Sequence, residues 1–150
     1  MEAILCANTL PTAGGAAAAR KTGGLSAWLA TNSVSNTGGG VAGANPVLTA
    51  GIPTTAQTEG TKRAFTETLL KEVIENVWTS GGQPTMVMVG ASNKQTLSSF
   101  TGIAANRFSI NKPEQGTIIG AADIYVSDFG ELSIVPNRFQ PKRDAYVLDT

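Results

Sequence analysis

Residues 65–89, FTETLLKEVIENVWTSGGQPTMVMV, contain the two elements around which the rest of the chain is expected to fold. Apolar side chains recur there at the period of an amphipathic helix, while polar side chains fill the opposite face. The apolar positions are Phe65, Leu69, Leu70, Val73, Ile74, Val77 and Trp78. Thr66 suits the N-cap, because its hydroxyl can accept a hydrogen bond from an amide of the first turn. We therefore predict a central helix over residues 66–80.

Neighbouring residues support this helix and define its end. Glu67 precedes Lys71 by four residues, a pairing that stabilises a helix by roughly 0.2–0.5 kcal/mol. Gly81 and Gly82 favour a left-handed turn at the C-terminus, and Pro84 prevents continuation. Residues 85–89 then form a nearly all-apolar strand, which is expected to be covered on both faces.

Composition limits the function classes. The 150 residues suffice for one domain of ordinary size with a real core. Acidic and basic residues number 11 each, and this balance argues against a dedicated nucleic-acid surface. No apolar run approaches the ~20 residues of a membrane span, and the N-terminus lacks the pattern of a secretory signal. Cys6, the single cysteine, cannot form an internal disulfide, and we interpret it as a structural thiol.

Histidine is absent, which removes the Ser-His-Asp and Cys-His catalytic devices and most zinc sites. It also removes the usual proton shuttle near neutral pH. Carboxylate or lysine chemistry stays possible without histidine, but an enzyme becomes less favoured. We assign no catalytic, cofactor-binding or metal-ligating residue, and we expect no cofactor and no small-molecule substrate.

The chain has two compositional regimes that meet near Gly60. Residues 1–60 contain four of the 22 charged side chains and ten of the 17 glycines. The segment from Met1 to Cys6 is typical of a helix end, Ala16–Ala19 is compatible with a helix, and Leu25–Leu29 predicts a helix of one or two turns. Residues 33–60 lack periodicity, which indicates a mobile loop or a segment ordered by a neighbouring subunit.

The second regime, residues 61–150, predicts further elements beyond the central helix. Residues 92–95 match a capping box, in which Ser92 would be the N-cap of a helix ending at Gly102. Residues 103–115 are a loop or a second short helix. Strands are expected at residues 124–127, 132–135 and 145–148, with turn chemistry at residues 128–131. This succession predicts an α+β layered domain with a mixed or antiparallel sheet.

Two glycine-containing motifs look like metal-binding or phosphate-binding sequences, but each is more simply interpreted as a turn or loop. Asp128-Phe129-Gly130 spells the metal-binding triplet of protein kinases, but the other kinase motifs are missing, so a turn is favoured. Gly60-Thr61-Lys62 comes closest to a phosphate-binding loop, but it lacks the upstream strand.

Charged and aromatic residues also have simple interpretations. Glu67, Glu72 and Glu75 favour a solvated helix face over a carboxylate metal site, because no partner helix completes a metal motif. The pairs Lys62-Arg63 and Lys142-Arg143 indicate surface positions or ion pairs between subunits. Trp28 and Trp78 are predicted to be core residues, with an interface anchor as the alternative for Trp28.

Several segments, taken in order, resemble a family of tailed-phage and prophage major capsid (head) proteins. They are residues 21–32 (KTGGLSAWLATN), 65–84, 90–102, 125–130 (YVSDFG), 135–139 (VPNRF) and 146–149. The resemblance covers most of residues 20–150, and its specificity lies in the ordered set.

The resemblance implies the Hong Kong 97 capsid fold. Residues 1–60 would hold the end of a spine helix and a peripheral-domain remnant with a mobile Gly-rich segment, and residues 61–150 would be the axial domain. The chain is then expected to be the C-terminal portion of a capsid protein, without the N-terminal arm and extended loop.

The resemblance also implies partners and a location. The partners would be copies of the chain itself, arranged in pentameric and hexameric capsomers. Packaged DNA would be touched only non-specifically, and no membrane would be involved. The location would be the virion, and the host cytoplasm during assembly.

Two other classes stay open from the residues alone. One is a small α+β enzyme using carboxylate or lysine chemistry at Asp128, Glu131 or Lys62. The other is a non-enzymatic binding module with a mobile Gly-rich arm.

Overall fold

The computed structural model describes residues 6–34, 41–100 and 124–150, and the chain divides into two compact units. Unit 1 is Met1–Ala64 and unit 2 is Phe65–Thr150. The predicted helix end at residues 1–5, the Gly38-Gly39-Gly40 run and the loop or helix at residues 103–115 lie outside the described residues. None of the described helices is long and apolar enough to cross a membrane.

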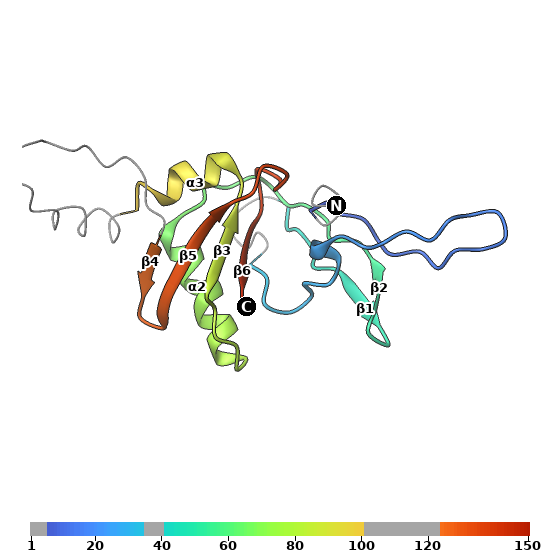
Figure 1. The fold of residues 1–150 in the computed structure, drawn as a ribbon, viewed down its shortest axis with the longest axis horizontal. Coiled ribbons are helices and arrows are strands. Elements are labelled where there is room, and N and C mark those ends of the chain that lie inside the picture. Colours follow the sequence, from blue (N-terminus) through green and yellow to red (C-terminus); the bar gives the residue numbers. More distant parts are fainter. Residues whose placement is uncertain (1–5, 35–40, 101–123) are drawn as a thin grey trace, which may run out of the picture. The chain divides into compact units, whose positions relative to one another are not determined.

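Unit 2 is an α+β layer, as the sequence predicted (Figure 1). Its elements are α2 (Glu67–Thr79), β3 (Met86–Val89), α3 (Ala91–Leu97), β4 (Ile124–Ser127), β5 (Gly130–Pro136) and β6 (Ala145–Leu148). The mixed sheet has the strand order β4-β5-β3-β6. Strand β3 is parallel to β5 and antiparallel to β6, and β4 is antiparallel to β5.

The ends of α2 form as the sequence indicates. Thr66 is the N-cap, and its hydroxyl accepts a hydrogen bond from the Leu69 amide at 3.4 Å. At the other end Gly81 adopts a left-handed φ of +89°. The Gly81 amide donates to the Trp78 carbonyl and the next amide, that of residue 82, to the Val77 carbonyl, so the last carbonyls of the helix are satisfied by the turn. The chain can therefore reverse directly from the helix towards β3.

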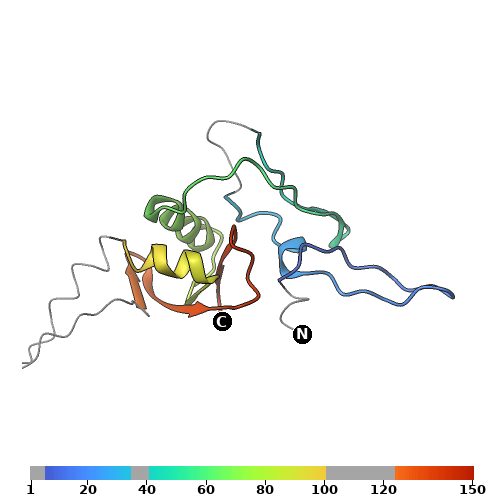
Figure 2. The ribbon, with the colours of Figure 1, turned by 90° about the horizontal axis from the view of Figure 1, so that it is seen from above.

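The core of unit 2 lies between the two helices and one face of the sheet. Val87 and Val89 in β3 are fully buried. The cluster comprises Leu70, Ile74, Val87, Val89, Leu97, Phe100, Tyr125, Leu132 and Ile134, with Phe65, Ala145 and Val147 packed against it. Figure 2 shows α2 and α3 on the same side of the sheet.

The sequence predicted that both faces of β3 are covered, and among the described residues this is wrong for most of the face that points away from the helices. Met86 and Met88, which point to that face, are only half-buried. On the same face Ile124 is 58% and Val126 is 59% exposed, whereas Tyr146, the partner of Met88 in β6, is buried. Because β3 has an antiparallel neighbour in a mixed sheet, much of this face can stay open to solvent.

The predicted capping box does not form. The N-cap of α3 is Gly90, without a side-chain hydrogen bond, and Ser92 lies inside the first turn. Strand β3 ends at Val89, so no loop remains in which Ser92 could cap the helix. A Cβ on Gly90 would lie 3.1 Å from the Gln140 carbonyl oxygen, which favours glycine at this junction.

Unit 1 has little buried apolar surface, and hydrogen bonds connect its segments. Its buried hydrophobic residues are Cys6 and Ala27 among those described. The Asn8 side-chain amide donates to the Gln57 carbonyl at 2.8 Å, and the Asn45 side-chain amide donates to the Ala30 carbonyl at 3.2 Å. Hydrogen bonding therefore contributes more to the order of unit 1 than a hydrophobic core does.

Two predictions for the first segments of unit 1 need correction. Residues 12–21 form a hairpin-like excursion, with bridges at Thr12–Lys21 and Gly15–Ala18, so Ala16–Ala19 is not a helix. These side chains are all exposed, and they form no apolar stripe that a helix would bury. The short helix η1 spans only Leu25–Ala27 and is a 3₁₀ turn, which leaves Trp28 exposed.

The prediction that residues 33–60 lack regular structure is also wrong at one place. Strands β1 (Val47–Thr49) and β2 (Ile52–Thr55) pair as an antiparallel hairpin. Ala50 and Gly51 connect them with φ values of +50° and +78°. A two-residue turn with both φ values positive normally carries Asn-Gly or Asp-Gly. Because Ala50 replaces the Asn or Asp, the sequence does not show the usual hairpin signal.

Replacing Ile74 with alanine should destabilise unit 2 by roughly 2–5 kcal/mol, because it leaves a cavity beneath the sheet. The matched control is Ile124→Ala, at a side chain that is 58% exposed, and it should change the free energy of unfolding by no more than about 0.5 kcal/mol. Urea unfolding followed by circular dichroism measures both. Equal losses in the two variants would contradict the one-sided core.

Candidate interaction surfaces

A polar network joins α2 to the edge strand β4. The Tyr125 hydroxyl donates to Glu67 Oε1 at 3.2 Å, and Lys71 Nζ lies 3.0 Å from the same oxygen. The predicted pairing of Glu67 with Lys71 is therefore confirmed. Burial, followed by the negative charge of Glu67, raises the pKa of Tyr125 from 10.0 to about 12. The network connects β4 to α2, and both of its interactions use the Glu67 carboxylate.

The other carboxylates of α2, Glu72 and Glu75, are exposed. Within residues 6–34, 41–100 and 124–150, no three His, Cys, Asp or Glu side chains group as ligands for a metal ion. The helix presents these two carboxylates to solvent, as expected for a solvated helix face.

The Asp128-Phe129-Gly130 motif forms the turn between β4 and β5. The Ser127 hydroxyl donates to the Gly130 carbonyl at 2.8 Å and accepts from the Phe129 amide at 3.3 Å. Gly130 has a φ of +134°, a conformation that favours glycine. The turn interpretation is confirmed, and Asp128 and Glu131 lie exposed on either side of Gly130.

Gly60-Thr61-Lys62 lies in unit 1 and does not lead into a helix. The Thr61 amide donates to the Val41 carbonyl at 2.9 Å, and the Thr61 hydroxyl accepts from the Val41 amide at 2.9 Å. The next helix, α2, begins only at Glu67. A phosphate-binding loop would instead direct its free amides at the ligand and continue into the helix.

The two basic pairs are exposed, as expected for surface residues, and the cysteine is buried, as expected for a structural thiol. Lys62 and Arg63 are exposed, and the Arg63 guanidinium donates to the Val34 carbonyl. The pair Lys142-Arg143 is exposed in the loop between β5 and β6. Cys6 is buried in unit 1.

Trp78 is not a core residue, contrary to the sequence-based prediction. It is 54% exposed at the last turn of α2, where its ring lies 5.2 Å from that of Phe129. Trp78 continues the row of Leu70 and Ile74 by one more helical turn, and the buried core of unit 2 ends before that turn. Trp28 is also largely exposed, so the core interpretation is wrong for both tryptophans.

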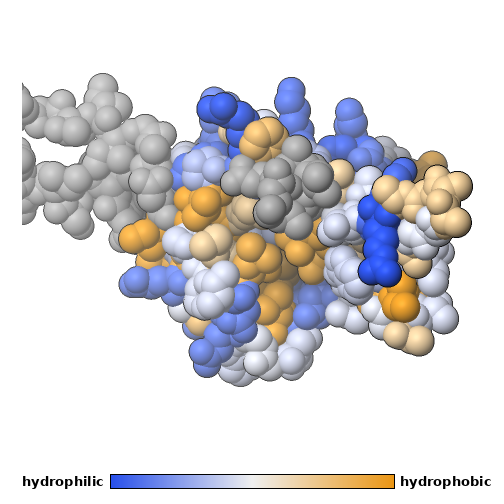
Figure 3. Space-filling view, turned by 45° about the vertical axis from the view of Figure 1, so that its right-hand side comes forward, coloured by the Kyte–Doolittle hydropathy of each residue, from blue (hydrophilic) through white to orange (hydrophobic). Residues whose placement is uncertain are grey.

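Large exposed hydrophobic side chains are frequent in both units. In unit 1 they are Trp28, Leu29, Val41, Val47 and Ile52, and in unit 2 they are Trp78, Ile124, Val126, Phe129, Val135 and Phe139. Figure 3 shows hydrophobic residues gathered over the sheet of unit 2. Phe139 was not predicted as an interaction residue, although a large aromatic inside the polar stretch 137–144 is a sign of surface exposure. Such a surface is typical of the class of proteins that assemble with other protein chains.

The particular family follows from comparison with known proteins. Residues 1–150 match the family model described as SU10 major capsid protein, and the chain belongs to that family. A search of the curated proteins finds no match. The chain is thus a structural capsid subunit of a phage, its family implies self-association into capsomers, and its place is the virion. The resemblance to phage major capsid proteins is confirmed.

The Tyr125 network predicts a specific loss of stability in alkali. Tyr125 in the unfolded chain ionises near pH 10, whereas in the folded chain its pKa is about 12, so folding favours the neutral phenol. The free energy of unfolding should therefore decrease as the pH rises through this window and be unaffected by Tyr125 below it. Urea titrations at several pH values measure the decrease.

Tyr125→Phe is the matched control, since it keeps the ring and removes the ionising hydroxyl. Its stability should fall less steeply across the alkaline window than that of the wild type. Identical slopes in the two proteins would show that the Tyr125 hydroxyl is not held neutral in the folded state.

Proposed function

We propose that the chain is a Hong Kong 97-type shell subunit whose unit 2 is the axial domain. In this proposal unit 1 contributes the end of the spine helix and a peripheral-domain remnant. Copies associate into five- and six-membered rings, and the rings form the icosahedral shell. Membership of a major capsid protein family and the α+β layer of unit 2 support this assignment.

The observation that carries the proposal is the one-sided construction of unit 2. Its core uses one face of the sheet and the inner faces of two helices, while large apolar side chains stay exposed elsewhere. Isolated exposed side chains are ordinary, but Trp78 and Phe129 are in contact and Ile124 and Val126 share one face. Aromatic side chains of this kind dominate contacts between protein chains.

Unit 1 supports the same proposal from its own composition. A segment with few charges, many glycines and little buried apolar surface gains stability by lying against neighbouring subunits. Its hairpin-like excursion at residues 12–21 exposes every side chain, and the β1–β2 hairpin exposes Val47 and Ile52.

The proposal assigns no catalytic role to the chain. Asp128 and Glu131 lie at an exposed turn of unit 2, and Lys62 is exposed in a segment of unit 1 without regular secondary structure. A shell protein with equal numbers of acidic and basic residues would contact packaged DNA without reading its sequence and would need no membrane. Assembly would take place in the host cytoplasm.

Purified protein should assemble in a concentration-dependent way into closed rings. Sedimentation velocity should show species of five or six copies of the 15.4 kDa chain or larger, and negative-stain microscopy should show rings. Heterologous contacts that close on themselves produce such rings. A single species of one chain's mass at every concentration would contradict the proposal.

A further inference from the structure

Many of the exposed charges of unit 2 lie at the two ends of its sheet, whereas those of Lys71 and Glu72 lie on α2 and belong to neither end. At one end the last turn of α2 meets the β4–β5 turn through the contact between the Trp78 and Phe129 rings, and exposed carboxylates lie close to these two residues in the sequence. We call this surface the acidic end, and it consists of Glu75, Trp78, Asp128, Phe129 and Glu131. Asp149 adds a further carboxylate at this end of the sheet, where it accepts a hydrogen bond from the Gln83 amide.

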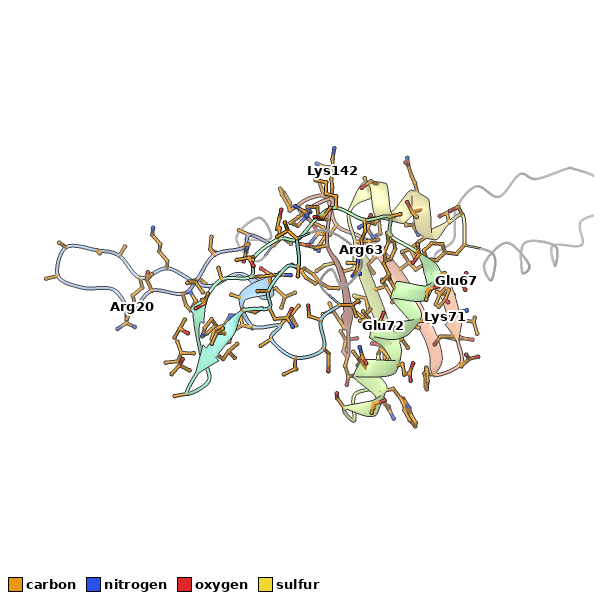
Figure 4. All side chains as sticks on the ribbon, turned by 180° about the vertical axis from the view of Figure 1, so that it is seen from behind. Arg20, Arg63, Glu67, Lys71, Glu72 and Lys142 are labelled. Carbon is orange, nitrogen blue, oxygen red and sulfur yellow. The ribbon has the colours of Figure 1, made fainter. Side chains whose placement is uncertain are left out.

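The opposite end of the sheet is mainly basic, and its loop also contains one half-buried carboxylate, Asp144. The loop of residues 137–144 joins β5 to β6, and it exposes Arg138, Lys142 and Arg143 together with Phe139. We call these four residues the basic end. Figure 4 shows Lys142 at this end of unit 2, whereas Glu72 lies on α2, away from this end.

Strand β5 fixes the distance between the two ends. It begins at Gly130 beside the acidic end and finishes at Pro136 beside the basic end. Seven residues of strand extend over roughly 20 Å. Within one copy the two sets of charges are therefore too far apart to neutralise each other.

We propose that neighbouring copies join head to tail, with the acidic end of one unit 2 against the basic end of the next. This inference rests on the proposed function, since it takes a second copy as the partner. Two equal ends would repel each other, whereas unequal ends bring carboxylates to Arg138 and Lys142. The Trp78–Phe129 pair and Phe139 then meet at the centre of the contact, where aromatic side chains contribute most.

The contact has two measurable properties. It is heterologous, because different surfaces of the two copies meet, and it therefore generates rings when the rotation closes. It also depends on exposed charges, so added salt should weaken association.

A charge-exchange experiment tests the inference. The variant Glu75→Lys/Asp128→Lys/Glu131→Lys has two basic ends, and the variant Arg138→Glu/Lys142→Glu has two acidic ends. Each alone should associate at least about tenfold more weakly than the wild type in sedimentation velocity. An equimolar mixture of the two variants should associate again. When the two variants alternate, each contact joins a basic end of one variant to an acidic end of the other.

Glu72→Lys is the control for a change of net charge, since it reverses an exposed charge on α2 that belongs to neither end. Its association should equal that of the wild type, and circular dichroism should show all variants folded. Two outcomes would overturn the head-to-tail contact and leave the proposed function intact. In one, the reversal variants associate as strongly as the wild type. In the other, the mixture of the two variants does not associate more strongly than each variant alone. A wild type that never associates would overturn both the contact and the proposed function.

Discussion

The packing of Val87 and Val89 against Leu70 and Ile74 is the interaction on which unit 2 depends. Strand β3 is central in the sheet, with β5 and β6 on either side, and it offers only two side chains to each face. One pair is fully buried beneath the helices, and this burial orders the strands that flank it. Without the pair, little buried apolar surface would connect α2 to the middle of the sheet, so the layer would lose its main stabilisation.

The same packing determines which surfaces remain for other chains. Because α2 and α3 lie on one side, Met86, Met88 and Val126 remain at least partly exposed on the other. Tyr125 illustrates the division at a single strand, since it is buried and bonded to Glu67 while its neighbours in β4 face outward. A subunit of a shell needs this arrangement, in which a small core holds a large contact surface in a defined shape.

Much of unit 2 could be predicted from the sequence, because its signals are local. The 3.6-residue stripe, the Thr66 cap and Gly81 predicted α2 to within one residue at each end. Strands β4 and β6 were predicted at their observed bounds, since short β-branched and aromatic runs are bounded there by turn residues. The failures depended on tertiary context: Trp78 fits the stripe but lies beyond the edge of the core, and Gly90 caps α3 in place of Ser92.

Unit 1 was less predictable for a physical reason. Its hairpin turns through Ala50 at positive φ, and its segments are joined by hydrogen bonds from side chains such as Asn8 and Asn45. Neither feature produces hydrophobic periodicity. The surface charges of unit 2 were visible in the sequence, but their separation into two ends required the topology of β5 between them.

The central claim is that the one-sided core of unit 2 leaves the two ends of its sheet to contact neighbouring copies. Hydrogen–deuterium exchange, measured by mass spectrometry on dispersed and assembled protein, tests this claim most directly. The account predicts slower exchange on assembly in peptides covering residues 126–131 and 137–144, and unchanged exchange in β3. Assembled protein in which neither peptide gains protection would contradict it.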